Sequence, residues 1–271
     1  MNWRKFSPAL LTLLVFLLAQ GIGALLMLLY GMNPGYMPVT AFSLILMAVD
    51  ILAVLGCYFI LRYICLYAVA DISSIHWRTG LIGIVAGILG AIAISILTEK
   101  VPLPDFMEQM SIEMSRNIWG LITLVIIGPI SEELIFREAI EGEMLRRDAS
   151  PWAAIIVSAL AFSIAHFNLA QGLYALPLAI LFGIIYYKTG NIILTSLLHI
   201  LNNGIAALQL HTLGEDIEDI SYAEWLGGPA NAYTLMIVCG VLCIALLRYF
   251  WNKYPSDIRA QKKAPPEWKE P

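Results

Sequence analysis

Long apolar stretches separated by short polar segments dominate this chain. A membrane-spanning helix needs about 20 mostly apolar residues, and that criterion marks eight candidate spans. They cover residues 8–30, 38–61, 80–98, 118–147, 152–167, 172–188, 190–209 and 230–251. The fourth differs from the others, because its apolar half, 118–130, continues into a polar half, 131–147, with helical spacing. The pattern predicts an all-α protein, a polytopic membrane helical bundle of about eight transmembrane helices.

Composition supports a chain embedded in lipid. Of the 271 residues, 59% are hydrophobic and 13% are charged, whereas soluble domains carry about 25% charged residues. A soluble fold of this size cannot bury so much apolar surface, so membrane lipid is the first expected partner. The basic residues are scattered, and we therefore expect no nucleic-acid partner.

The distribution of lysine and arginine predicts the orientation. With eight spans, one side of the membrane receives Arg4, Lys5, Arg62, Arg78, Arg146, Arg147, Lys188 and the tail 253–271. The other side receives Lys100, Arg116 and an acidic loop, 215–224. Because cytoplasmic loops are enriched in Lys and Arg, we predict a multi-pass plasma (inner) membrane protein with both termini cytoplasmic.

Ionisable residues inside the spans are the candidates for function, since each costs at least about 2.5 kcal/mol on the insertion scale. Four places qualify: the run 131–137, His166, His199 with Asn202 and Asn203, and Asp50. Asp50 stands alone in the second span, and we assign it a structural or pathway role.

The run 131–137 holds two adjacent carboxylates with different expected surroundings. Glu133 and Arg137 are four residues apart, so they share a helix face and can pair. Glu132 is turned away by about 100° and has no local partner. An unpaired carboxylate in low dielectric can exchange protons near neutrality, as a general base must. The later acidic residues of this span, Glu138, Glu141 and Glu143, are expected at its wet cytoplasmic end.

Three of these groups are predicted at similar depth. At a rise of about 1.5 Å per residue, Glu132 and His166 lie about 22 Å from the cytoplasmic end of their helices. His199 lies about 16 Å from the cytoplasmic end of its helix. The three side chains can therefore meet if the fourth, fifth and seventh spans pack together.

Taken in order, the motifs resemble those of the CPBP family, also called the Abi family. That family includes type II CAAX prenyl endopeptidases and bacteriocin-processing or self-immunity proteins. Its pattern is Glu-Glu-x-x-x-Arg, then Phe-x-x-x-His, then His-x-x-x-Asn. Here it reads Glu132-Glu133…Arg137, Phe162…His166 and His199…Asn203.

The resemblance implies an intramembrane endopeptidase whose substrate is a membrane-associated protein or peptide. It implies that Glu132 activates water, that His166 orients this water or shuttles its proton, and that His199 and Asn203 stabilise the oxyanion. In the same way Glu133 and Arg137 are implied to orient the catalytic side chains. One carboxylate and two imidazoles are also a known zinc set, so a zinc ion held by Glu132, His166 and His199 stays open as an alternative.

Two other classes of function compete with proteolysis. One is a non-proteolytic scaffold or bacteriocin self-immunity protein on the same fold. The other is a transporter with a proton relay, which would predict internal repeats and paired broken helices, and the sequence shows neither. We divide the chain into N-terminal transmembrane helices, 1–117, a CPBP/Abi catalytic core, 118–209, and a last transmembrane helix with a cytoplasmic tail, 210–271.

The orientation can be tested with a reporter fused after Lys269. We expect a reporter that functions only in the cytoplasm to be active there, because the basic residues gather on the side of both termini. A reporter active only outside the cytoplasm would contradict the eight-span topology.

Overall fold

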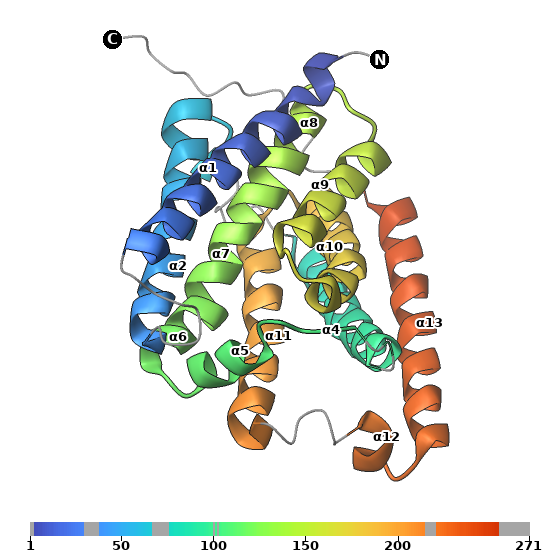
Figure 1. The fold of residues 1–271 in the computed structure, drawn as a ribbon. Coiled ribbons are helices and arrows are strands. Elements are labelled where there is room, and N and C mark those ends of the chain that lie inside the picture. Colours follow the sequence, from blue (N-terminus) through green and yellow to red (C-terminus); the bar gives the residue numbers. More distant parts are fainter. Residues whose placement is uncertain are drawn as a thin grey trace.

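The structure, a computed structural model, describes residues 3–29, 38–66, 76–99, 101, 103–214 and 221–254. All regular elements in these ranges are helices, and they form the bundle of Figure 1. The acidic residues 215–219 of the predicted loop, Lys100 and the tail from residue 255 lie outside the described ranges.

The first half of the bundle begins with the short 3₁₀ helix η1 (Trp3–Lys5) and the long helix α1 (Ser7–Leu29). Helix α2 (Val39–Leu55) continues into the π-helical segment η3 (Gly56–Leu61), and α4 (Trp77–Thr98) follows. The short helix α5 (Glu108–Ser115) precedes the fourth span.

The fourth span is one continuous helical path from Ile118 to Arg146 that alternates between two helix types. Its α-helical parts are α6 (Ile118–Leu121), α7 (Gly128–Glu132) and α8 (Glu143–Arg146). Between them lie two π-helical parts, η5 (Ile122–Ile127) and η6 (Glu133–Gly142). Because π-helical segments inside helices are rare and frequently mark functional sites, this span is distinctive by geometry as well as by sequence.

The remaining helices are α9 (Pro151–Ala165), α10 (Leu169–Thr189), α11 (Ile192–Leu213), α12 (Tyr222–Trp225) and α13 (Pro229–Lys253). Each of the eight predicted ranges is thus helical. Within the described ranges, seven helices are long and apolar enough to cross a membrane, whereas α9, with 15 residues, is shorter.

Helix α9 is short because the chain turns back at Phe167, which has a positive φ of 50°. Asn168 then starts α10, and its side-chain oxygen accepts hydrogen bonds from the amides of Ala170 and Gln171. The side-chain nitrogen of Asn168 donates to Asp105 at 2.5 Å. Helices α9 and α10 therefore form a hairpin, tied to the segment between α4 and α5.

The first and last described helical turns lie at the same end of the bundle (Figure 1). Lys5 donates to the carbonyl of Asp148, which precedes α9. In the first turn of α9, Trp152 stacks on Trp251 of α13 with ring centroids 5.0 Å apart. Lys188, at the end of α10, donates to the carbonyl of Trp251 at 2.7 Å. The described ends of the chain therefore face the same side, while the compartment on that side stays a prediction.

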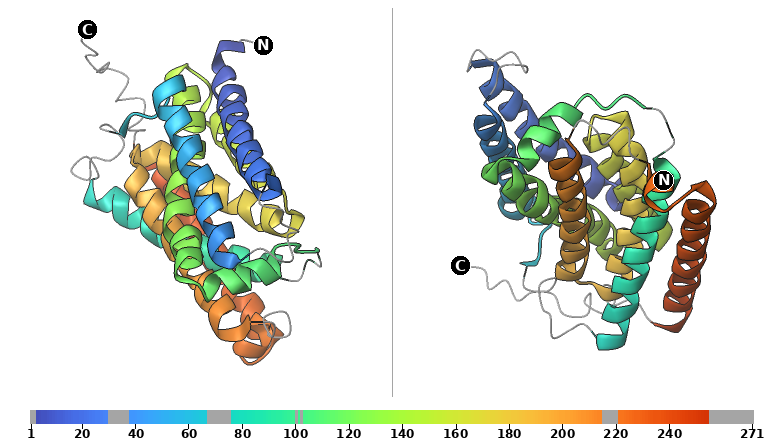
Figure 2. Two further views of the ribbon diagram at one scale, coloured as in Figure 1. Left: turned by 60° about the vertical axis from the view of Figure 1, so that its left-hand side comes forward. Right: turned by 90° about the horizontal axis from the view of Figure 1, so that it is seen from below.

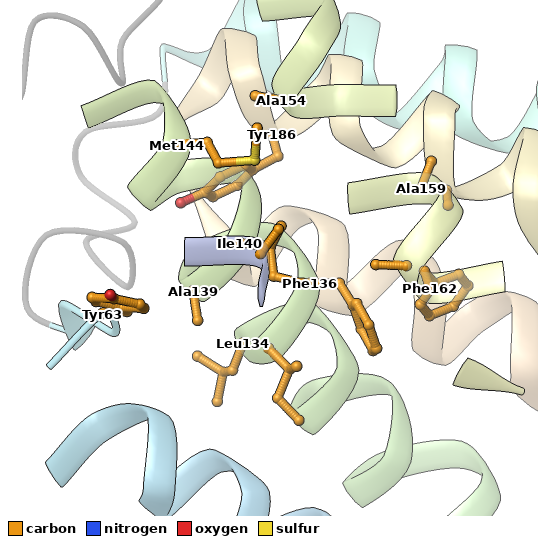
Figure 3. Close-up of a cluster of buried hydrophobic side chains, with 14 of the residues drawn as sticks. Tyr63, Leu134, Phe136, Ala139, Ile140, Met144, Ala154, Ala159, Phe162 and Tyr186 are labelled. Carbon is orange, nitrogen blue, oxygen red and sulfur yellow. The ribbon is translucent and has the colours of Figure 1, made fainter. Parts of the chain in front are cut away.

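The fourth span, α9 and α10 form the centre of the bundle. Every residue of η6 is buried, and Figure 3 shows its side chains packed against those of α9 and α10. Phe136 contacts the ring of Phe162 on α9 with centroids 5.2 Å apart and the ring of Phe16 on α1 at 5.8 Å.

Helix α13 lies at the periphery, packed along α4, as Figure 2 shows from below. Only 17% of its apolar window is buried inside the protein, against 56% for α10. The exposed apolar side chains of α13 therefore face lipid, and the polar groups of the fourth span are enclosed by the central helices.

One glycine fixes the entry to the fourth span. A Cβ atom at Gly120 would lie 2.2 Å from the backbone oxygen of Met114, whereas a Cβ at Gly21 of α1 would meet nothing within 4 Å. We expect Gly120→Ala to destabilise the protein by about 1–3 kcal/mol, the usual range for overpacking. Thermal unfolding in detergent measures this, with Gly21→Ala as the matched control. Equal melting temperatures for the two variants would contradict the close approach of α5 and α6.

Candidate active site

The two adjacent glutamates of the fourth span lie in different surroundings, as their spacing predicts. Glu132 ends α7 and Glu133 begins η6. The side chain of Glu133 is fully buried, whereas 27% of the Glu132 side chain is exposed. Glu132 is therefore the carboxylate that a water molecule or a substrate can reach.

His199 of α11 lies between these two carboxylates. Its Nδ1 is 3.0 Å from Glu133 Oε1, and its Nε2 is 3.5 Å from Glu132 Oε2. The ring is buried and also contacts Phe162 and Phe182 at centroid distances of 5.8 and 5.7 Å. Because a carboxylate can only accept, the imidazole donates from Nδ1 to Glu133. His199 thus joins α11 to the fourth span at the level of Glu132.

Arg137 forms the ion pair that its spacing predicts, with Nε 3.3 Å from Glu133 Oε2. The guanidinium is fully buried and lies over the ring of Phe162 at 4.7 Å and that of Phe182 at 5.9 Å. Stacking on aromatic faces stabilises a desolvated cation by about 2 kcal/mol or more. Glu133 is therefore held from two sides, by Arg137 and by His199.

His166 ends α9 and is half-buried. Its Nδ1 lies 2.9 Å from the carbonyl oxygen of Phe162. Since a carbonyl only accepts, Nδ1 carries the proton, and Nε2 of the neutral ring is left as an acceptor. The ring contacts Phe162, which also contacts His199. Phe162 therefore connects His166 to His199 by ring contacts. That His166 and Glu132 share one water molecule stays a prediction.

Asn203, one turn after His199, has a contact that the sequence did not suggest. Its side-chain nitrogen donates to the carbonyl of Leu124 at 3.0 Å. Gly128 donates to Thr123 in the π-helical pattern, so the corresponding donor to Leu124 would be residue 129, a proline without an N–H. Asn203 fills the position that Pro129 leaves open, and its second N–H remains for another acceptor.

A row of polar groups extends from Asn203 along α11. Asn202 donates to the side-chain oxygen of Asn203 at 3.3 Å, and Tyr174 of α10 donates to Asn202 at 2.5 Å. The orientation of the Asn203 amide is thus fixed from both sides. The sequence indicates Asn202 only as a neighbour of Asn203. Its hydrogen bond with Tyr174 could not be predicted, because Tyr174 lies on another helix.

Asp50 of α2 faces the same region. Its carboxylate lies near Gly128, one turn before Glu132, and interacts electrostatically with Glu132. Asp50 is therefore a neighbour of the site.

The expectation that Glu138 and Glu141 lie at the wet end of the span is wrong, since both are fully buried. Glu138 accepts hydrogen bonds from Arg146, at 3.0 Å, from the hydroxyl of Tyr186 and from the amide of Cys65. Only Glu143 lies at the partly exposed end, where it pairs with Arg146 and Arg147 at 2.8 Å each. The polar half of the span is enclosed because other helices supply its partners.

The three side chains considered for zinc do not form a ligand set. Among the residues that the structure describes, no group of three or more His, Cys, Asp or Glu side chains has the arrangement of a metal site. Glu132 and His199 supply two donors close together, but the ring of His166 is directed to Phe162.

Two cavities of the described ranges lie apart from these residues. The cavities found in the described ranges include one of 440 Å³ on the outer face of α13 and one of 180 Å³ where α4 meets α12 and α13. Neither is lined by Glu132, His166 or His199.

Together these features define a class: a polytopic helical membrane protein with a buried carboxylate–imidazole site. Residues 114–205 match the family model described as Rce1-like, type II CAAX prenyl endopeptidase. The match confirms the resemblance to the CPBP family, and it contains Glu132, Glu133, Arg137, His166, His199 and Asn203. No curated protein matches the chain, and no solved structure does.

The two carboxylates should respond differently to substitution. We expect Arg137→Ala to lower the stability by about 3–5 kcal/mol, because it leaves Glu133 charged and without its cation in a buried position. Glu132→Gln should leave stability near that of the wild type, since Glu132 is partly exposed. Thermal unfolding of both variants in the same detergent measures the difference. Equal stability of the two would show that the division of roles between the carboxylates is wrong.

Proposed function

We propose that this protein is an intramembrane endopeptidase of the CAAX-protease type, in which Glu132 activates the attacking water. One observation carries the proposal: Glu132 is the partly exposed carboxylate of a buried polar site, 3.5 Å from His199. It lies in the segment that matches a family of prenyl endopeptidases. The substrate is a membrane-associated protein or peptide, cleaved near its C-terminus.

In the proposed first step, the Glu132 carboxylate takes a proton from water while the water oxygen bonds to the peptide carbonyl carbon. The carbonyl oxygen becomes an oxyanion, and the free N–H of Asn203 donates to it. His166 orients the water with Nε2, the ring nitrogen left as an acceptor. Glu132 has the exposure that a general base needs, and His199 Nε2, 3.5 Å away, can accept a hydrogen bond from the Glu132 carboxyl group once it has taken up the proton.

In the second step the oxyanion collapses and the C–N bond breaks. The proton held on Glu132 passes to the leaving nitrogen, which gives an amine and a carboxylic acid as products. His199 stays hydrogen-bonded to Glu133 throughout, and the Arg137 ion pair keeps Glu133 in place. In this scheme His199 interacts with the two carboxylates and not with the oxyanion. Asn203 is therefore the principal oxyanion donor.

The competing scaffold or self-immunity function needs no general base. It would leave the contacts of Glu133 with Arg137 and His199 as a structural tie between helices, with Glu132 unused. The two functions therefore differ in a single measurable property, which is whether the protein hydrolyses a peptide bond.

The test is cleavage of a prenylated CAAX peptide by the purified protein in lipid nanodiscs, followed by mass spectrometry of the products. We expect Glu132→Gln to lower the cleavage rate by about 10²–10⁴-fold, the usual contribution of a general base. Glu113→Gln on the exposed face of α5 is the matched control and should cleave like the wild type. Cleavage by the wild type and by Glu132→Gln at the same rate would overturn the proposal.

Two further arms make the assay more informative. The same peptide without its lipid tests whether the substrate must be prenylated. A chelator that removes activity, with recovery on adding Zn²⁺ alone, would add a metal ion to the scheme. A wild type that is folded in nanodiscs but cleaves none of the peptides would favour the scaffold function.

A further inference from the structure

Orphaned polar atoms are concentrated in one part of the buried fourth span. Seven buried side-chain nitrogen or oxygen atoms have no hydrogen-bond partner in the part of the chain that the structure describes. Six of the seven belong to Glu133, Arg137 and Glu141, which follow one another at intervals of four residues along η6. Both carboxyl oxygens of Glu141 are among them. Glu141 takes no part in the proposed reaction.

Among the described residues, Arg137 is the cation that acts on Glu141. On its own helix, Glu141 interacts with the positive charge of Arg137 and with the negative charge of Glu133. From α10 it faces Gly183 and the hydroxyl of Tyr186, which already donates to Glu138. From α9 the apolar side chain of Ile155 lies beside the same point of α10, 3.1 Å from a Cβ atom built at Gly183.

The charges at this position do not balance if every carboxyl group is ionised. The charge of Arg137 is already matched by Glu133, 3.3 Å away. A second carboxylate would leave one surplus negative charge in a fully buried position, and an uncompensated buried ion costs several kcal/mol. A carboxylic acid avoids that cost and still offers a carbonyl oxygen as an acceptor, while the guanidinium has Nη1 and Nη2 donors without a hydrogen-bond partner in the described part of the chain.

The backbone of α10 leaves room for such a group. A Cβ atom at Gly183 would lie 2.8 Å from Glu141 Oε2, closer than real contacts allow. The absent side chain lets the Glu141 carboxyl group pack directly against α10. The location of the carboxyl group is therefore fixed by packing as well as by charge.

We propose that Glu141 is a neutral carboxylic acid that packs against Arg137 and acts as a positioning residue for the site. Held between Glu133 and Glu141, the guanidinium keeps Glu133 directed at His199, and His199 lies beside Glu132. The role in catalysis rests on the proposed function, whereas the neutral state of Glu141 does not depend on it.

Infrared spectroscopy tests the neutral state without any substrate. A protonated carboxyl group has a C=O stretching band that a carboxylate lacks. In vesicles at neutral pH we expect the wild type to show this band and Glu141→Gln to lose intensity from it. Glu143→Gln is the control and should keep the band, because Glu143 forms ion pairs with Arg146 and Arg147. The comparison is repeated in an Asp50→Asn background, since Asp50 is another carboxyl group inside the spans.

The positioning role is tested by cleavage kinetics. We expect Glu141→Gln, which keeps size and neutrality, to retain kcat and KM near the wild-type values. Glu141→Ala should lower kcat several-fold with KM unchanged, because the guanidinium loses its second support.

Two results would overturn the inference. One is an infrared spectrum of Glu141→Gln that is identical to the wild type in the C=O region. The other is a loss of kcat in Glu141→Gln as large as that in Glu141→Ala, which would mean that the site needs a charge at this position. A wild type that cleaves nothing but shows the band would contradict the proposed function alone.

Discussion

The low dielectric of the bundle interior governs the arrangement of this protein. Charged side chains at such depth persist only where each has a partner of opposite charge or a hydrogen bond. The fourth span carries its carboxylates and cations within one short stretch, so most partners come from the same helix. The others include Tyr186 of α10 and His199 of α11, and both helices must then pack against the fourth span. Pairing of charges thereby helps to hold α10 and α11 in place.

The same constraint separates the two adjacent glutamates into different roles. Glu133 is enclosed by Arg137 and His199 and is fixed in place. Glu132 lies 3.5 Å from the other nitrogen of the same imidazole and remains partly exposed. A single histidine therefore connects a structural ion pair to an accessible carboxylate. The π-helical turns around α7 accompany this division, because they set which side of the helix each carboxylate faces.

Much of the fold could be predicted from the sequence, since apolar length and helical spacing depend on nearby residues. The Glu133–Arg137 pair was predictable for the same reason. The burial of Glu138 and Glu141 was not, because their surroundings are made by Tyr186 and Gly183 from a helix more than 40 residues away in sequence. The short length of α9 depends on the backbone conformation of Phe167, which hydropathy does not report. The partner of Asn203 is a backbone carbonyl, and carbonyls are identical at every position of a sequence.

The contact between Asn203 and Leu124 makes Pro129 more than a helix irregularity. Any residue with a backbone N–H at position 129 would compete with the Asn203 amide for the carbonyl of Leu124. The proline therefore reserves that acceptor for α11, at the cost of one bond within its own helix. The missing N–H of Pro129 in the fourth span thus helps to set the rotation of α11 about its own axis. A sequence comparison would then expect positions 129 and 203 to change together, although their side chains need never touch.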